Sequence, residues 1–146
     1  MRLKEFYLEL SALLNYFQSL ALFFARVVVA YGFYKPASMK WADIDATALW
    51  FEQLGIPFAY FSTLLTASIE IIGVVLLFLG LFTRFISIPL IVILFVAIGT
   101  VHIHNGFSIA DNGFEIPLYY ILFLTIFASI GAGKFSIDHI LFGKDK

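Results

Sequence analysis

Residues 57–81, PFAYFSTLLTASIEIIGVVLLFLGL, form a nearly uninterrupted apolar stretch in which Glu70 is the single charged residue. A second apolar stretch, RFISIPLIVILFVAIGTVH at residues 84–102, follows after only two residues. A helix rises about 1.5 Å per residue and needs about 20 apolar residues to cross the hydrocarbon core of a bilayer. The two stretches therefore predict two transmembrane helices joined by a short turn.

Two further apolar stretches, at about residues 15–34 and 115–131, flank this central pair. Both are close to the length that a membrane span requires. We therefore predict an all-α membrane protein built as a four-transmembrane-helix bundle. We expect residues 1–146 to form a single transmembrane domain, because no remaining segment is long enough to build a separate soluble core.

The composition agrees with a membrane location and excludes several classes of function. Hydrophobic residues make up 62% of the chain, charged residues only 13%, and the mean hydropathy is +0.97. A soluble domain carries about 25% charged residues. The net charge of -1 lacks the basic excess that nucleic-acid binding requires. Because the chain has no cysteine, it has no disulfides, thiolate nucleophiles or iron–sulfur ligands.

Two segments outside the spans have a mixed apolar and charged character. Residues 1–14 suit a helix lying at the membrane interface, and Glu5 and Glu9 before the apolar region argue against a cleaved signal peptide. Residues 36–56 carry Trp41 and Trp50 among charged residues. We expect this first outer loop to form a short segment that caps the bundle, with the tryptophans at headgroup level.

The lysines and arginines predict the orientation of the bundle. With four spans, only Lys35 and Lys40 fall on the side opposite the termini. Cytoplasmic loops carry an excess of these residues, so we expect both termini in the cytoplasm and the chain in the inner membrane of a bacterium. The residues expected on the cytoplasmic side are Arg2, Lys4, Arg84, Lys134, Lys144 and Lys146.

Arg26 and Glu70 are the ionisable residues placed inside the predicted spans. Each is expected at about 16 Å from the cytoplasmic end of its helix. An isolated charge at that depth costs at least about 2.5 kcal/mol, and opposite charges at one level lower this cost by pairing. We therefore predict a contact between Arg26 and Glu70. Such a pair either marks a substrate site or only fixes how the helices pack, and the sequence leaves both readings open.

A second set of polar residues is expected at the outer rim of the bundle. Lys35 ends the first span, His102 ends the third and Glu115 opens the fourth. Together with Arg26 and Glu70 they predict a polar path from the outer surface toward mid-membrane, lined by substrate-binding residues. His102 and His104 are the candidate metal ligands. Because closely spaced histidines beside loop carboxylates match many loops that bind no metal, we predict no metal site.

Short motifs spread over nearly the whole chain resemble the DoxX family of small four-helix bacterial membrane proteins. The order and spacing of the motifs together carry this resemblance. One difference is Tyr31, where many members have a histidine before the glycine. The matching elements are Arg26, Gly32-Phe-Tyr-Lys35, Leu54-Gly-Ile-Pro57, Glu70-Ile-Ile-Gly73, Leu79-Gly-Leu-Phe-Thr-Arg84, His102, Asn105-Gly-Phe107, Gly113-Phe-Glu115 and Gly133-Lys-Phe-Ser-Ile-Asp138.

The resemblance implies a membrane subunit of a quinone-linked oxidoreductase, with a quinone or small reductant bound between the helices in an outward-facing polar cavity. It implies no covalently bound cofactor. Such a chain lacks cysteines, haem ligands and a flavin motif, so it needs a redox partner protein. The other expected partners are membrane lipids and further copies of the chain in a homo-oligomer. Two alternatives stay open: a non-redox protein that binds or transports a small molecule, and a structural or assembly subunit. The sequence does not decide whether the chain itself is catalytic.

Overall fold

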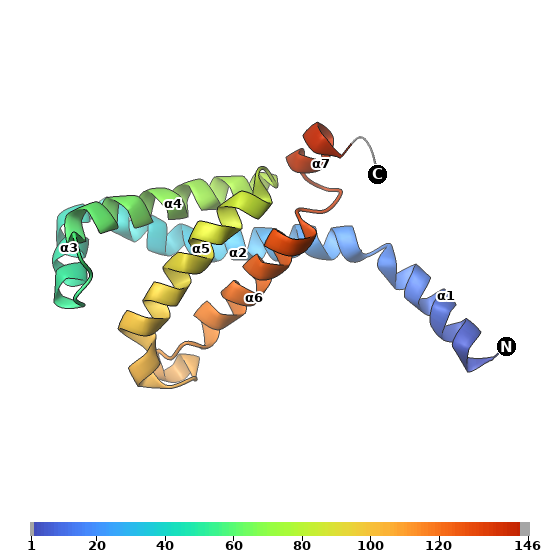
Figure 1. The fold of residues 1–146 in the computed structure, drawn as a ribbon, viewed down its shortest axis with the longest axis horizontal. Coiled ribbons are helices and arrows are strands. Elements are labelled where there is room, and N and C mark those ends of the chain that lie inside the picture. The colour runs from blue at the N-terminus through green and yellow to red at the C-terminus, as the bar shows by residue number, and fades with distance from the viewer. Residues whose placement is uncertain (1, 144–146) are drawn as a thin grey trace.

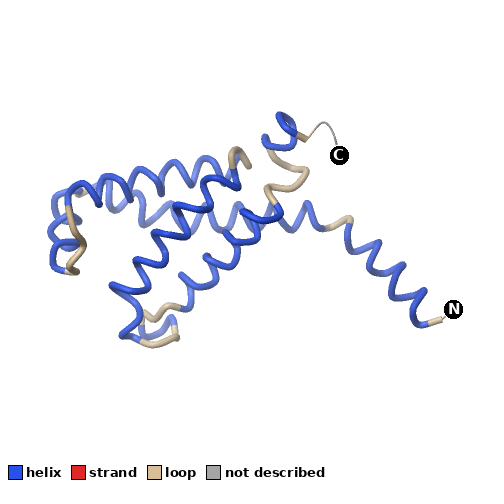
Figure 2. The backbone as a smooth tube through the Cα atoms, in the orientation of Figure 1, coloured by secondary structure: helices blue, strands red, loops and turns tan. Residues whose placement is uncertain are grey.

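The computed structural model describes residues 2–143, and the regular secondary structure of these residues is entirely helical (Figures 1 and 2). The predicted all-α architecture is therefore confirmed. A π-helical turn (Ile98–His102) and two 3-10 turns (Ile103–Asn105 and Ile109–Asp111) continue α5 into the loop before α6. The α-helices are α1 (Leu3–Asn15), α2 (Gln18–Ala42), α3 (Ile44–Gln53), α4 (Ala59–Leu79), α5 (Thr83–Ala97), α6 (Glu115–Ile130) and α7 (Ile137–Phe142).

Three helical stretches are long and apolar enough to cross a membrane. They are 18–42, 59–79 and 83–105, and they correspond to the first three predicted spans. The fourth predicted span is the apolar helix α6, which has 16 residues and is about 24 Å long. The four apolar helices of the structure thus match the four apolar stretches of the sequence.

The first span is longer than predicted, because Pro36 does not end it. Helix α2 continues through Pro36 to Ala42, and Phe33 and Ala37 on either side of the proline are buried. A proline inside a helix removes one backbone hydrogen bond and costs about 3 kcal/mol. Burying this face of α2 against the bundle offsets that cost. The expected loop at 36–56 is consequently reduced to Asp43, the helix α3 and a turn that starts at Leu54 and leads into α4.

Helix α3 is the predicted short segment in the first loop. It begins at Asp43, whose Oδ1 accepts a hydrogen bond from the Ala46 amide at 2.9 Å, and its buried residues are Ala48 and Phe51. Figure 1 shows α3 across the end of the α2–α4 pair. The prediction of a short helix in this loop is confirmed.

The bundle consists of two antiparallel helix pairs, α2 with α4 and α5 with α6. Glycines allow the pairs to approach: a Cβ on Gly73 would lie 2.9 Å from Leu90 of α5, and one on Gly32 would overlap the Tyr120 ring of α6. Away from these crossings the pairs diverge, so that α3 and the loop before α6 lie well apart (Figure 1). The core between the pairs includes Leu22, Val29, Ala30, Phe33, Leu77, Ile86, Leu90, Leu94, Ile121, Leu124 and Phe127.

Candidate functional site

Arg26 is completely buried and bonds to backbone carbonyls. Its Nε donates to the Ala132 oxygen at 3.1 Å and its Nη2 to the Phe135 oxygen at 2.5 Å. Its Nη1 donates to the last turn of α4, at 2.7 Å to Leu77 and 3.4 Å to Phe78. We call this set, Arg26 with these four carbonyls, the Arg26 junction. Because carbonyls at the C-terminus of a helix lack partners within the helix, one guanidinium here satisfies α4 and the segment after α6 together.

Two residues of the neighbouring turns hold the Arg26 junction in shape. Gly80 follows α4 with a φ of 67°, and a Cβ there would lie 2.5 Å from both Arg26 Nη1 and Ser136 Cβ. Asp138 accepts hydrogen bonds from the amides of Phe82 at 2.7 Å and Thr83 at 3.0 Å, which caps the N-terminus of α5. The junction therefore ties α2, α4, α5 and the chain around α7 together.

The predicted contact between Arg26 and Glu70 is wrong. Arg26 lies level with Leu77 at the end of α4, whereas Glu70 is seven residues earlier, about 10 Å along that helix. The prediction assumed that the first two spans end at one level. Instead, α2 extends past the end of α4 (Figure 1), which moves Glu70 toward the C-terminal half of α2.

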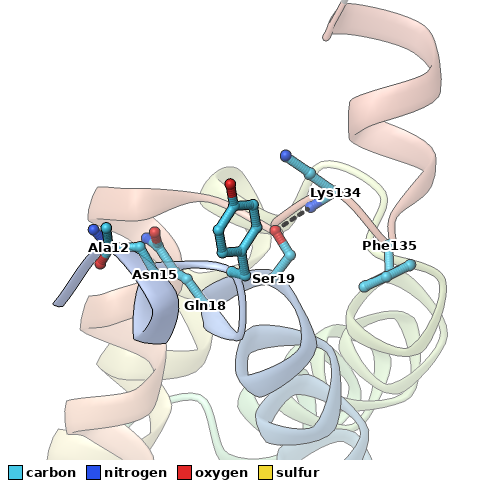
Figure 3. A pocket seen from close by; sticks show the side chains of 7 residues that line it. Ala12, Asn15, Gln18, Ser19, Lys134 and Phe135 are labelled. Carbon is cyan, nitrogen blue, oxygen red and sulfur yellow. Dashed lines mark hydrogen bonds between the residues drawn. The ribbon is translucent and has the colours of Figure 1, made fainter. Parts of the chain in front are cut away.

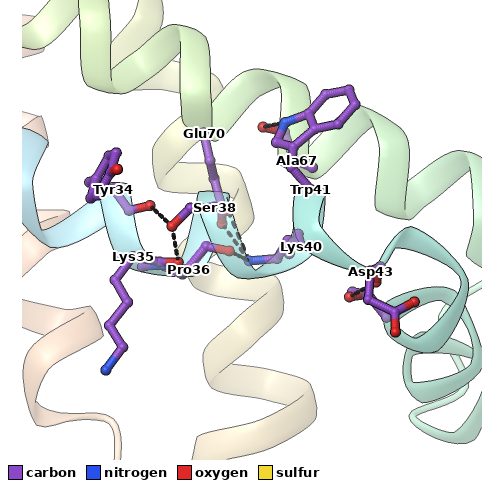
Figure 4. Close-up of polar contacts among 10 residues, drawn as sticks. Tyr34, Lys35, Pro36, Ser38, Lys40, Trp41, Asp43, Ala67 and Glu70 are labelled. Atoms are coloured by element: carbon purple, nitrogen blue, oxygen red, sulfur yellow. Dashed lines mark hydrogen bonds and ion pairs between the residues drawn. The ribbon is translucent and has the colours of Figure 1, made fainter.

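Glu70 pairs with Lys40 instead. Lys40 Nζ donates to Glu70 Oε2 at 2.8 Å and to Oε1 at 3.1 Å, with a longer contact of 3.4 Å to the Pro36 carbonyl (Figure 4). The side chains are 15% and 5% exposed. This is the one ion pair within 4 Å among residues 2–143. It meets the expected need for a counter-charge to Glu70, but with a different partner.

Lys40 lies in the segment that was predicted to form the first outer loop. Its position follows from the helix face that contains Phe33 and Ala37, because Lys40 continues their spacing by one turn. Trp41 adds a second tie, since its Nε1 donates to the Ala67 carbonyl of α4 at 3.1 Å. The apolar residues beyond Pro36 were therefore the signal that the helix continues.

The predicted rim residues do not meet at one mouth. Lys35 is exposed and points away from Glu70 (Figure 4). His102 Nδ1 bonds to the Asn112 carbonyl at 2.9 Å, and Glu115 accepts from the Ile109 amide at 2.9 Å and the Tyr119 hydroxyl at 3.0 Å. The bonds of His102 and Glu115 therefore lie within the loop between α5 and α6. Because the two helix pairs diverge, this loop is far from α3 (Figure 1). The expected single polar path is wrong.

His104 is exposed in the same loop. Within the described part of the chain, no three histidine, aspartate or glutamate side chains come together as a metal site would need. His102 and His104 therefore lie close together in this loop, and His102 bonds to its backbone.

Comparison with known proteins places these features in a family. The DoxX family profile matches residues 21–103, which is more than half of the chain. The chain belongs to the DoxX family. Two uncharacterized proteins of Haemophilus influenzae are similar to it: one is 30% identical over 129 residues, covering 83% of each chain. The other is 34% identical over 125 residues, covering 83% of this chain and 90% of the relative. No solved structure matches.

The DoxX match includes Arg26, Lys40 and Glu70, but ends before Asp138. Two hollows of this DoxX protein are lined by other residues. One of about 420 Å³ lies where α1 meets α2, and one of about 210 Å³ lies along α1. None of the five predicted binding residues lines either hollow.

Proposed function

We propose that this DoxX protein is the membrane subunit of a quinone-linked oxidoreductase, and that the Lys40–Glu70 pair is its quinone-facing group. The observation that supports this proposal is an ion pair between two membrane helices whose lysine keeps some exposure. Ionisable residues within spans are expensive and are usually kept for function. The family resemblance supplies the substrate class.

The chemistry of the pair fits a quinone headgroup. Lys40 has three ammonium hydrogens, two of which bond well to Glu70, while the contact to the Pro36 carbonyl is long at 3.4 Å. Lys40 can exchange that long contact for a quinone carbonyl. Glu70 can hold or release a proton beside it. Since neither hollow contains the pair, we place the headgroup at the exposed side of Lys40, reached from the bilayer.

Arg26 has a different role in this proposal. Every nitrogen of its guanidinium already donates to a carbonyl, and the residue is fully buried. We therefore assign Arg26 to the architecture and Lys40 to the substrate, with His102, Lys35 and Glu115 outside the quinone site.

We further propose four spans, including α6, with both termini in the cytoplasm of an inner-membrane protein. The positions of Arg84 and Lys134 near the Arg26 junction support this orientation. The chain contains no cysteine, so single introduced thiols report topology. In intact spheroplasts, an impermeant maleimide should label His104→Cys and leave Lys134→Cys unlabelled. Labelling of Lys134→Cys alone would reverse the orientation.

The quinone proposal is tested by calorimetric titration of the detergent-purified protein with a short-chain ubiquinone analogue. We expect Lys40→Met and Glu70→Gln each to weaken binding by at least about tenfold, the weight of one hydrogen bond to a charged group. Lys35→Met, on the same helix but pointing away from Glu70, is the matched control and should bind normally. Equal affinity of all three variants would remove the quinone site from this pair.

A second candidate function is an assembly subunit whose partner holds the active site. The Arg26 junction favours this second function, because the fully buried Arg26 bonds to backbone carbonyls and so holds helices together. The two candidates are separated by the double variant Lys40→Met/Glu70→Leu. An assembly subunit should keep its cellular function and its complexes with this variant, whereas a quinone-binding subunit should keep the complexes and lose electron transfer.

A further inference from the structure

Helix α1 has an apolar face that no part of the bundle covers. Figure 1 shows α1 leaving the bundle at an angle to α2. Six of its large apolar residues recur at the spacing of one helix face, each at least 41% exposed, while Leu8 lies on the opposite side. Lys4, Glu5, Glu9 and Asn15 lie on the opposite side. The apolar face is formed by Leu3, Phe6, Tyr7, Leu10, Leu13 and Leu14.

The bend between α1 and α2 forms a hollow whose largely apolar lining includes several polar side chains. We call it the elbow pocket; its volume is about 420 Å³, and Figure 3 shows its walls. Asn15, Gln18 and Ser19 contribute polar groups from the two helices, and Lys134 contributes an ammonium from the segment after α6. Ala12, Tyr16 and Phe135 complete the lining.

The backbone fixes Lys134 at this place. Its amide donates to Ser19 Oγ at 3.3 Å, and a Cβ on the preceding Gly133 would lie 3.3 Å from Leu22. The Lys134 ammonium has no hydrogen bond or ion pair within residues 2–143. A positive charge therefore stands at a hollow with apolar and polar walls, beside an amphipathic helix and at the end of a membrane span.

We propose that the elbow pocket holds the phosphate group of a phospholipid, while α1 lies in the headgroup layer with its apolar face toward the acyl chains. A lysine and side-chain amides bind phosphate by charge and by donated hydrogen bonds. Amphipathic helices of this kind settle about 5–10 Å into the headgroup boundary. The proposal depends neither on quinone binding nor on the proposed orientation of the termini.

The phosphate site is tested by native mass spectrometry of the full-length protein in detergent, titrated with phosphatidylglycerol. We expect Lys134→Gln to weaken lipid binding about fivefold, the usual weight of one lysine at an anionic surface. Lys35→Gln, an exposed lysine at the far end of α2, should bind like the parent. Equal weakening by both variants, or by neither, overturns the site.

Inorganic phosphate distinguishes a lipid from a soluble ligand. If the pocket takes a lipid, millimolar phosphate should leave bound phosphatidylglycerol in place. Displacement of the lipid from the parent but not from Lys134→Gln would assign the pocket to a soluble phosphate and overturn the lipid proposal.

The placement of α1 is tested with single thiols, which the absence of native cysteine makes unambiguous. In liposomes permeabilised to a water-soluble maleimide, Lys4→Cys on the polar side should react at least about tenfold faster than Leu10→Cys on the apolar side. Equal rates would mean that α1 projects into water, and the headgroup placement would fall while the phosphate test still stands.

Discussion

The Arg26 junction and the Lys40–Glu70 pair lie on the same two helices but resolve a buried charge in different ways. The guanidinium forks between carbonyls of two chain segments, the end of α4 and the segment after α6, and meets no solvent. The lysine faces one carboxylate, keeps 15% exposure and has one long contact to spare. A planar five-donor group suits a fixed junction, whereas an ammonium on a flexible stem can change partners. The fully buried structural junction therefore lies toward one end of α2, and the partly exposed ion pair, which we propose faces the quinone, lies toward the other.

The largest effect is expected at the junction. Arg26→Met leaves the carbonyls of Ala132 and Phe135 without their donor and that of Leu77 with only the Gly80 amide at 3.3 Å, and should lower the free energy of unfolding by about 4 kcal/mol. Arg26→Lys should recover only part of the loss, because an ammonium cannot fork between these segments. Unfolding in mixed detergent micelles measures both. Arg2→Met, at the exposed start of α1, is the control. If it lowers the free energy of unfolding as much as Arg26→Met does, the junction has no special role in stability.

Gly80→Ala sharpens the comparison without touching a charge. The new Cβ would collide with Arg26 and Ser136 and would also strain a φ of 67°, for a cost of about 2.5 kcal/mol. Gly55→Ala has a φ of 77° with nothing within 4 Å, so it should show the backbone strain alone, about 1 kcal/mol. If the thermal denaturation of these variants gives equal losses, Arg26 is not packed against Gly80.

The Lys40–Glu70 pair should be less important for stability than the junction. Lys40→Met leaves a carboxylate without its partner and should cost about 2 kcal/mol, less than a fully buried pair because Lys40 is partly exposed. Adding Glu70→Leu removes the stranded charge, so the double variant should return to within about 1 kcal/mol of the parent. Unfolding measurements that show the double variant to be less stable than Lys40→Met would make the pair structural.

The smallest effect concerns the cap on α5. Asp138→Ala removes the acceptor of the Phe82 and Thr83 amides and should cost about 1 kcal/mol. Asp111→Ala, in the loop before α6, has no side-chain hydrogen bond among the described residues and should be neutral. Hydrogen exchange at the start of α5 should rise only in Asp138→Ala, and unchanged exchange would contradict the cap.

The apolar stretches were sufficient to predict the helices, because each carries few charges over a length that suits a span. The register between helices was not predictable in this way. The composition of residues 15–34 does not show that the start of α2 extends past the end of α4. Arg26 was therefore placed beside Glu70 instead of Leu77. The first span was predicted to end at about residue 34, whereas burial of Phe33 and Ala37 carries α2 past Pro36. Asp138 contacts the start of α5 only because the fold brings these distant segments together, and no nearby sequence pattern predicts that contact.

The separation of the two charged sites is tested most directly by two double-mutant cycles measured in the same unfolding assay. One cycle combines Lys40→Met with Glu70→Gln, and the other combines Arg26→Met with Glu70→Gln. Residues in contact couple by about 0.5–3 kcal/mol, while distant ones add within about 0.5 kcal/mol. We predict a coupling above about 1 kcal/mol for Lys40 with Glu70 and additivity for Arg26 with Glu70. Strong coupling of Arg26 with Glu70, and none with Lys40, would contradict the account.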